Sequence, residues 1–167
     1  MFTVYWDIDG VINPDDLPSA SSFSGWRSGS YRESVVSQLK ASWSADLIDR
    51  INRLSRRDDI DMRWLTSWGD EAYAFGATAG VRQGVMRGTS EENFDSRNEW
   101  WKLDVIEDHV HMMAEGDSIV WIDDSILTEP GTVTWLADHQ IVRWISPDPD
   151  IGFTRSEWET LENLLAT

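Results

Sequence analysis

The segment at residues 4–11 (VYWDIDGV) limits the possible folds of this chain more than any other feature of its sequence. Its apolar and aromatic run ends in two carboxylates one residue apart, Asp7 and Asp9, and Gly10 follows, where the backbone can turn. Successive side chains on a strand point to opposite faces, so Asp7 and Asp9 start out on the same side. Two close carboxylates repel each other, and burial adds to the cost. We therefore expect a bound cation at the carboxyl end of this strand, where open parallel sheets bind their ligands.

Strands and helices alternate along the rest of the chain. Apolar runs predict strands at 61–66, 118–124 and 141–145, with a brief one near 85–86. Helices are predicted after the N-cap Ser44, over 70–79, from a capping box at 96–99 to Gly116, over 130–139, and after the capping box of Thr154 and Glu157. This order predicts an α/β fold, a Rossmann-like three-layer αβα sandwich whose central sheet is mostly parallel and has the first strand at its centre. The 167 residues suit one domain, 1–167, with residues 11–43 as a loop or flap insert.

Composition excludes several kinds of function. The net charge of −16 repels nucleic acid and anionic lipid and disfavours a general nucleic-acid binder, although a local basic path could survive. The absence of cysteine excludes disulfides and thiolate chemistry. No apolar run is long enough to cross a membrane and residues 1–3 are not basic, so we expect a soluble, cytoplasmic protein. His109 and His111 are expected on the surface near a helix end, and the eleven tryptophans mainly in the core.

Polar side chains stand at the ends of several predicted elements. They are Asp7 and Asp9 after the first strand, Thr66 and Ser67 after the second, Lys102 early in a helix, and Asp123 and Asp124 after the strand at 118. If the first strand neighbours the one at 118, the four carboxylates converge at one edge of the sheet. Ligation by oxygen alone suits Mg²⁺, which binds one or two carboxylates together with substrate phosphate. A hydroxyl from Thr66 and the positive charge of Lys102 suit a phosphoryl group.

These residues resemble the four signatures of the haloacid dehalogenase superfamily. Residues 7–12 (DIDGVI) resemble the first signature, Leu65-Thr66 the second, Lys102 the third and residues 120–124 (VWIDD) the fourth. All four occur in the order of the superfamily, and the resemblance spans nearly the whole chain. In Leu65-Thr66-Ser67-Trp68 and in its terminal, tryptophan-bearing helix, the chain resembles small, tryptophan-rich actinobacterial or phage members.

The resemblance implies a Mg²⁺-dependent phosphomonoester phosphatase. Asp7 would be the nucleophile that forms an aspartyl-phosphate, and Asp9 the general acid and base. Asp7, the Asp9 backbone carbonyl and Asp123 would hold Mg²⁺, and Asp124 would bind it through water or orient Lys102. Lys102 and Thr66, with Ser67 beside it, would position the phosphoryl oxygens. Asp9 favours phosphatase chemistry because dehalogenases of the superfamily lack an acid at that position.

Superfamily members often carry a cap domain in one of two intervals, which here are residues 11–43 and 67–95. Both are short or loop-like, so we expect no cap. A site without a cap can admit a large substrate, or it can take its lid from a second subunit in a homo-oligomer.

Three alternatives stay open. A nucleotide or polynucleotide 3′-end phosphatase fits an open site, but the acidic charge weighs against it. A receiver domain uses the same residue types, but its phosphoacceptor strand follows its acidic pair, the reverse of the order here. A catalytically inactive module that binds a partner would require a distorted site, since every signature residue is present.

Overall fold

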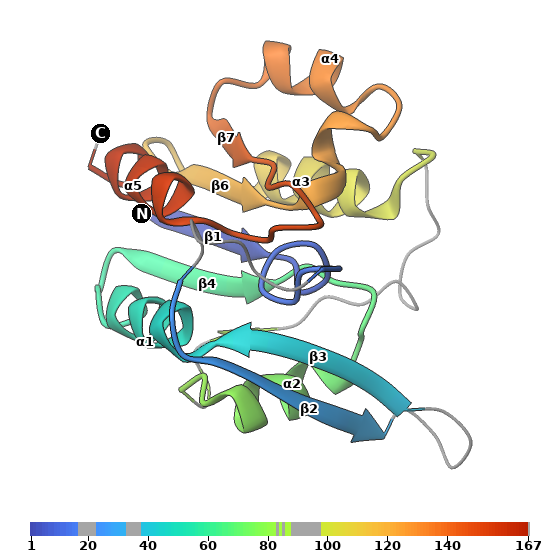
Figure 1. Ribbon diagram of the computed structural model, residues 1–167. Coiled ribbons are helices and arrows are strands. Elements are labelled where there is room, and N and C mark those ends of the chain that lie inside the picture. The colour runs from blue at the N-terminus through green and yellow to red at the C-terminus, as the bar shows by residue number, and fades with distance from the viewer. Residues whose placement is uncertain (17–22, 33–37, 83, 85, 88–97, 167) are drawn as a thin grey trace.

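The computed structural model describes residues 1–16, 23–32, 38–82, 84, 86–87 and 98–166. A sheet of five strands forms its centre, in the order β5-β4-β1-β6-β7 (Figure 1). The strands are β1 (Phe2–Trp6), β4 (Ile60–Trp64), β5 (Met86–Arg87), β6 (Ser118–Ile122) and β7 (Val142–Ile145). Every neighbouring pair is parallel. The predicted parallel sheet with the first strand at its centre is confirmed.

The register of β1 with its neighbours determines where the site forms. Trp6, the last residue of β1, is aligned with Trp64 of β4 and Ile122 of β6. The residues that follow these strands therefore emerge at the same edge of the sheet. The neighbour relation between β1 and β6, on which the predicted convergence of carboxylates depended, is confirmed.

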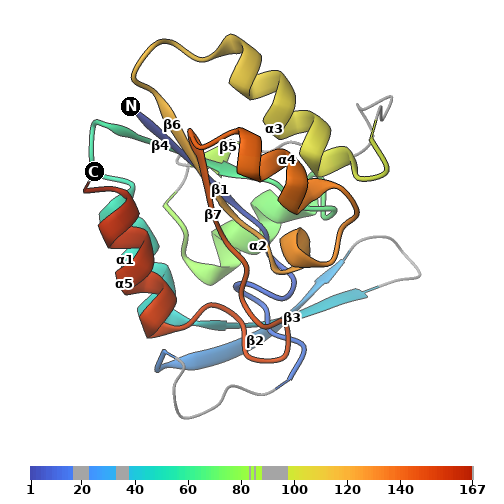
Figure 2. The ribbon, with the colours of Figure 1, turned by 90° about the horizontal axis from the view of Figure 1, so that it is seen from above.

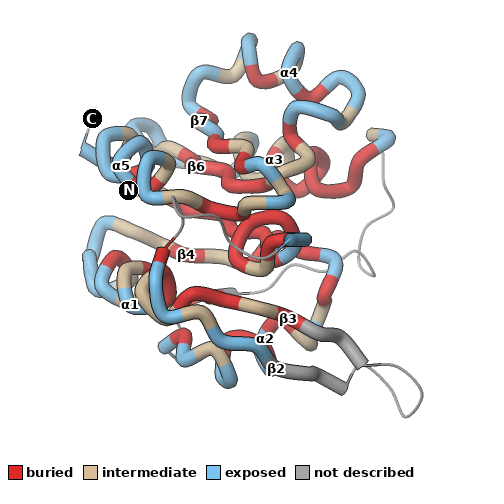
Figure 3. Tube along the Cα trace, viewed as in Figure 1, coloured by how far each residue is buried: buried red, intermediate tan, exposed pale blue. Residues whose placement is uncertain are grey.

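Helices cover both faces of the sheet and complete three layers (Figure 2). One face is covered by α1 (Ala45–Leu54), α2 (Glu71–Ala79) and α5 (Arg155–Leu164), and the other by α3 (Trp101–Met112) and α4 (Thr132–Asp138), with a short 3-10 helix at Asp124–Leu127. The alternation of β1 divides the core between these faces: Val4 and Trp6 belong to one hydrophobic cluster and Tyr5 to the other. Burial accordingly concentrates along the sheet, and the outer sides of the helices are exposed (Figure 3).

Two predicted helix starts are confirmed by their capping contacts. The Ser44 hydroxyl accepts a hydrogen bond from the backbone N–H of Leu47 at the start of α1. At the start of α5, Thr154 and Glu157 form the reciprocal capping box. These local contacts satisfy N–H groups that the first turn of a helix leaves without partners.

The intervals in which a cap would lie hold small elements. Between β1 and α1, β2 (Trp26–Arg32) and β3 (Gln38–Ser44) form an antiparallel hairpin, where a loop or flap was predicted. The Asn13 side-chain oxygen accepts the Ser42 backbone N–H at 2.8 Å and thereby ties the hairpin to the turn after β1. The second interval holds α2 and β5. Neither interval contains a cap domain within the residues that the structure describes. Separately, none of the described helices has the length and apolar character that a membrane span requires.

The helix predicted to open at residues 96–99 begins later along the chain. Helix α3 begins at Trp101, with Trp100 as an N-cap that makes no side-chain capping bond; residues 96 and 97 lie outside the described residues. The buried carboxylate of Asp104 instead accepts the backbone N–H of Asn98 at 3.2 Å and its amide N–H at 2.6 Å. A residue inside the helix therefore holds the segment that leads into it. The helix also ends earlier than predicted, at Met112 instead of Gly116.

His109 corrects another expectation, because it is half-buried and its ring packs against a strand. Its Nδ1 lies 3.0 Å from the Tyr5 hydroxyl oxygen, and the two rings meet edge to face. Burial first, and then the charge of Arg63, lower the pKa of His109. His111 is exposed, as predicted.

Candidate active site

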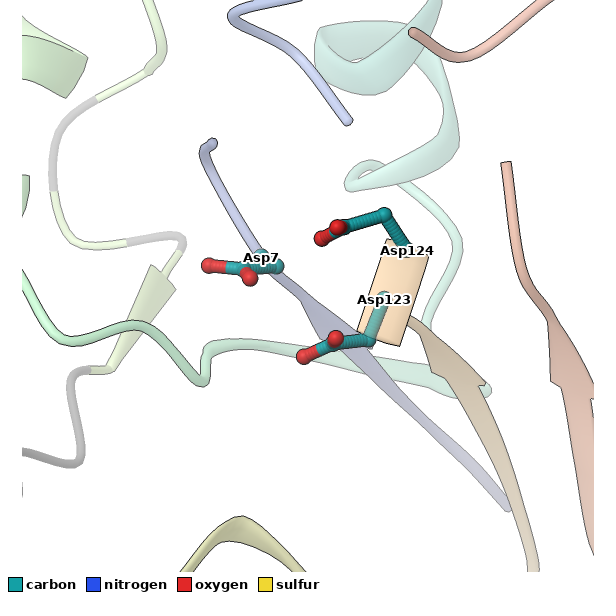
Figure 4. Close-up of side chains that lie close together, drawn as sticks. All are labelled: Asp7, Asp123 and Asp124. Carbon is teal, nitrogen blue, oxygen red and sulfur yellow. The ribbon is translucent and has the colours of Figure 1, made fainter. Parts of the chain in front are cut away.

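Three aspartates gather at the carboxyl edge of the sheet. Asp7 follows β1, and Asp123 and Asp124 follow β6; each offers an oxygen within 4.8 Å of those of the other two. Figure 4 shows the three carboxylates on neighbouring chain segments. The predicted convergence is therefore confirmed for these three residues, while the carboxylate of Asp9 is not part of the cluster.

Lys102 reaches this cluster from the first turn of α3. Its Nζ lies 2.5 Å from Oδ2 of Asp7 and 2.6 Å from Oδ2 of Asp123, and only 8% of its side chain is exposed. The ammonium also lies 5.8 Å from the centre of the Trp100 ring, which stacks on Trp121 of β6. Ion pairing and packing together fix the lysine between the two carboxylates, in agreement with its predicted place in the site.

Among the described residues, the cluster pairs one ammonium with three carboxylates, and the pKa values of its members reflect this imbalance. Burial would lower the pKa of Lys102, but the charges of Asp7 and Asp123 outweigh it and raise the pKa above its ordinary value. Burial, followed by the charge of Asp7, raises the pKa of Asp123 to about 7, and the same two causes raise the pKa of Asp124. The site therefore carries more negative charge than the lysine can neutralise. Hard divalent cations prefer such a set of carboxylate oxygens, so the donor chemistry fits a metal ion.

Backbone contacts hold the carboxylates in place. Oδ1 of Asp7 accepts the Ile8 N–H at 2.7 Å, and Oδ1 of Asp123 accepts the Ser125 N–H at 3.0 Å. Gly10 has a positive φ of +66°, and a Cβ at this position would lie 2.5 Å from Cγ of Asp124. The glycine is therefore required both by the turn after β1 and by the close approach of Asp124.

The predicted phosphate-binding pair follows β4 at the same edge. The Leu65 N–H donates to the Trp6 carbonyl and continues the pairing of the strands, which brings Thr66 beside the segment that carries Asp7. Thr66 is buried, and its hydroxyl oxygen lies 3.5 Å from the backbone nitrogen of Trp68. Ser67 is exposed. Both residues thus follow β4 at the edge of the sheet where the carboxylates gather.

Asp9 is exposed, and its two oxygens are bound by residues that the sequence did not identify. Oδ1 accepts the Asn13 amide N–H and Oδ2 accepts the Trp68 indole N–H, each at 2.7 Å. Trp68 directly follows the predicted phosphate-binding pair, but nothing in the sequence indicates where its N–H points. The structure therefore adds Asn13 and Trp68 to the residues of the candidate site.

The comparison with protein families identifies a relationship over most of the chain. The model described as "HAD domain in Swiss Army Knife RNA repair proteins" matches residues 3–158. Comparisons with curated proteins and with solved structures found no match. The family match agrees with the four signatures and with the three-layer fold around them. The chain therefore belongs to the haloacid dehalogenase (HAD) domains of Swiss Army Knife RNA repair proteins.

Proposed function

We propose that this HAD-type hydrolase is a Mg²⁺-dependent phosphomonoester phosphatase. One observation supports this proposal above the others: Lys102 bridges Asp7 and Asp123 inside a cluster of three carboxylates at the edge where the strands end. The residue that we propose as nucleophile thereby lies beside a buried cation and acidic oxygen donors. These are the groups that phosphoryl transfer requires, because its catalysis consists mainly of positioning and charge stabilisation.

In the proposed reaction, an oxygen of the Asp7 carboxylate attacks phosphorus while the ester P–O bond breaks. Asp9 donates its proton to the departing oxygen, and an aspartyl-phosphate remains on Asp7. Asp9, now ionised, takes a proton from water, whose oxygen attacks phosphorus; the bond between phosphorus and the Asp7 oxygen breaks, which restores the Asp7 carboxylate and releases inorganic phosphate. Lys102 and Thr66, with Ser67 beside it, position the phosphoryl oxygens and offset their charge.

The proposed Mg²⁺ ligands are the Asp7 carboxylate, the Asp9 backbone carbonyl and Asp123, with Asp124 bound through water or directed at Lys102. The excess of carboxylates over ammonium in this cluster supports that assignment. When bound, the ion would neutralise the negative charge of the phosphoryl group. The chain's own residues hold the nucleophile, supply the proton and balance the rest of the charge.

A second candidate is a phosphatase that acts on a 3′-phosphorylated nucleic-acid end or on a nucleotide. The description of the family, which refers to RNA repair proteins, favours this substrate class. So does the lack of a cap domain among the described residues, because an open site can admit the end of a strand. The net charge of −16 opposes it, since a polyanion is repelled at long range. The substrate would then be held mainly through its terminal phosphate.

The test is phosphate release from 4-nitrophenyl phosphate, from nucleoside monophosphates and from a 3′-phosphorylated oligoribonucleotide, each with Mg²⁺ and with chelator. We expect turnover that chelator abolishes, that Asp7→Asn loses and that Asp16→Asn keeps, since Asp16 is an exposed acid outside the site. Preference for the oligonucleotide would establish the second candidate. A folded protein that binds Mg²⁺ but releases no phosphate from any of them would refute the proposal and favour a binding module.

A further inference from the structure

The carboxylate of Asp9 is held more firmly than an exposed side chain requires. Its two oxygens accept hydrogen bonds from two different segments: the turn after β1, through Asn13, and the segment after β4, through Trp68. Both hydrogen bonds measure 2.7 Å, at the short end of the range for an N–H donor and an oxygen acceptor. Two donors from separate segments fix the rotation of the carboxyl group as well as its position.

Trp68 is a rigid donor. Only 8% of it is exposed, and its ring packs edge to face on Phe75 of α2, with 5.5 Å between the ring centres. Phe75 is itself fully buried and contacts Trp43 and Trp64 in the same way. The indole N–H cannot turn to another acceptor unless this aromatic cluster moves, because an indole has a single donor and its direction is fixed by the ring.

Asn13 is fixed from its other side. Its side-chain oxygen accepts the Ser42 N–H of the hairpin at 2.8 Å, so its amide nitrogen must face Asp9. Each carboxylate oxygen of Asp9 has two acceptor positions, and Asn13 and Trp68 use one on each oxygen. A position therefore remains for the proton that Asp9 transfers in the proposed reaction.

We propose that Trp68 and Asn13 are positioning residues that hold the Asp9 carboxyl group where it donates its proton to the leaving oxygen. This inference rests on the proposed function. Both donors bind the carboxylate that remains once the proton has moved to the departing oxygen, so they assist the step in which the ester bond breaks. They therefore determine how well the site expels leaving groups that need protonation.

Leaving groups of different acidity separate this role from a merely structural one. Phenyl phosphate and 4-nitrophenyl phosphate are close in shape, but 4-nitrophenolate departs without a proton and phenolate departs far less readily. General acid catalysis contributes about 10²–10⁴-fold where it is needed. Loss of positioning is therefore expected to reduce turnover of phenyl phosphate selectively, whereas a general disturbance of the fold would reduce turnover of both esters.

The variant Trp68→Phe keeps an aromatic ring against Phe75 and removes the N–H. Its matched control is Trp158→Phe, because Trp158 lies in the same hydrophobic cluster and its buried indole N–H has no hydrogen-bond acceptor among the described residues. We expect Trp68→Phe to lower kcat/KM for phenyl phosphate by about tenfold or more, with 4-nitrophenyl phosphate changed less than about twofold. Trp158→Phe should change both esters equally.

An equal change for both esters in folded Trp68→Phe, or no change in either, would overturn the inference. If Trp68→Phe does not fold, the same two esters are compared in Asn13→Ala, which is expected to lose turnover of phenyl phosphate selectively. An equal change for both esters, or no change, would again overturn the inference. A wild-type protein that hydrolyses neither ester, nor a nucleoside monophosphate, nor the 3′-phosphorylated oligoribonucleotide would overturn the proposed function, and this inference with it. The inference alone fails if the wild type turns over the esters and Asp7→Asn loses this turnover, while Trp68→Phe shows no selective loss; the proposed function then stands.

Discussion

Lys102→Met is expected to destabilise the protein strongly when no metal is present. Methionine keeps most of the length and apolar contact of the lysine stem but removes the ammonium that lies between Asp7 and Asp123. The side chains of these three residues are at most 8% exposed. Water therefore cannot replace the lost interaction, and the carboxylates are left close together without their counter-charge.

The magnitude follows from burial. Removal of one partner from a buried ion pair costs about 3–5 kcal/mol, because the remaining charge stays buried without compensation. The same change at an exposed pair costs at most about 1 kcal/mol. Arg155 and Asp46 form such a pair, with 48% and 26% of their side chains exposed. Lys102→Met should therefore lose several times more free energy of unfolding than Arg155→Met.

The assay is urea unfolding in chelator for the wild type and both variants, with the slope of each transition compared as well as its midpoint. Mg²⁺ should then return part of the lost stability to Lys102→Met, because a bound cation replaces the missing positive charge. A loss below about 1 kcal/mol for Lys102→Met would refute this reasoning, since the pair would then behave as an exposed one. An equal loss of unfolding free energy in Arg155→Met and Lys102→Met would also refute it.

Three further changes test other parts of the structure. Gly10→Ala should lower the unfolding midpoint more than Gly80→Ala. The angle φ is positive at both positions, but only at Gly10 would a Cβ meet another side chain, that of Asp124 at 2.5 Å. Equal midpoints of the two variants would contradict this. The lowered pKa of His109 means that the folded protein favours its neutral form, so its contribution to stability is present above the unfolded pKa of about 6.5 and is lost as the pH falls below that value and through the lower folded pKa. His109→Gln should thus flatten the fall in unfolding free energy between about pH 7 and pH 5, and an unchanged slope would exclude this role. Thr154→Ala removes the cap of α5 and should cost about 1 kcal/mol in thermal unfolding, whereas an unaltered midpoint would mean that the capping box contributes nothing measurable.

The features that sequence reasoning predicted correctly depend on local patterns. The run at 4–6 is apolar or aromatic on both faces, as a central parallel strand must be, and Ser44 and Thr154 stand immediately before helical apolar spacing. The convergence of Asp7 with Asp123 required one further assumption, that their strands are neighbours. The order of the signatures favoured it, and the register confirms it.

The features that were missed depend on contacts between distant residues or on competition between local signals. Trp68 and Asp9 are 59 positions apart, and His109 and Tyr5 are 104 positions apart, so no local pattern predicts either contact. The helix predicted to open at 96–99 begins later, at Trp101, and Asp104 inside it binds Asn98; residues 96 and 97 lie outside the described residues.

The central claim is that Asp7 receives the phosphoryl group. The most direct measurement is acid quenching during turnover of 4-nitrophenyl phosphate with Mg²⁺, followed by peptide mass analysis of the wild type and of Asp9→Asn, in which hydrolysis of the intermediate should be slowed. The account predicts one phosphoryl group on Asp7, stable in acid, removed by hydroxylamine and enriched in Asp9→Asn. Turnover with a phosphoryl group on another residue, or with none on Asp7 in either protein, would contradict it.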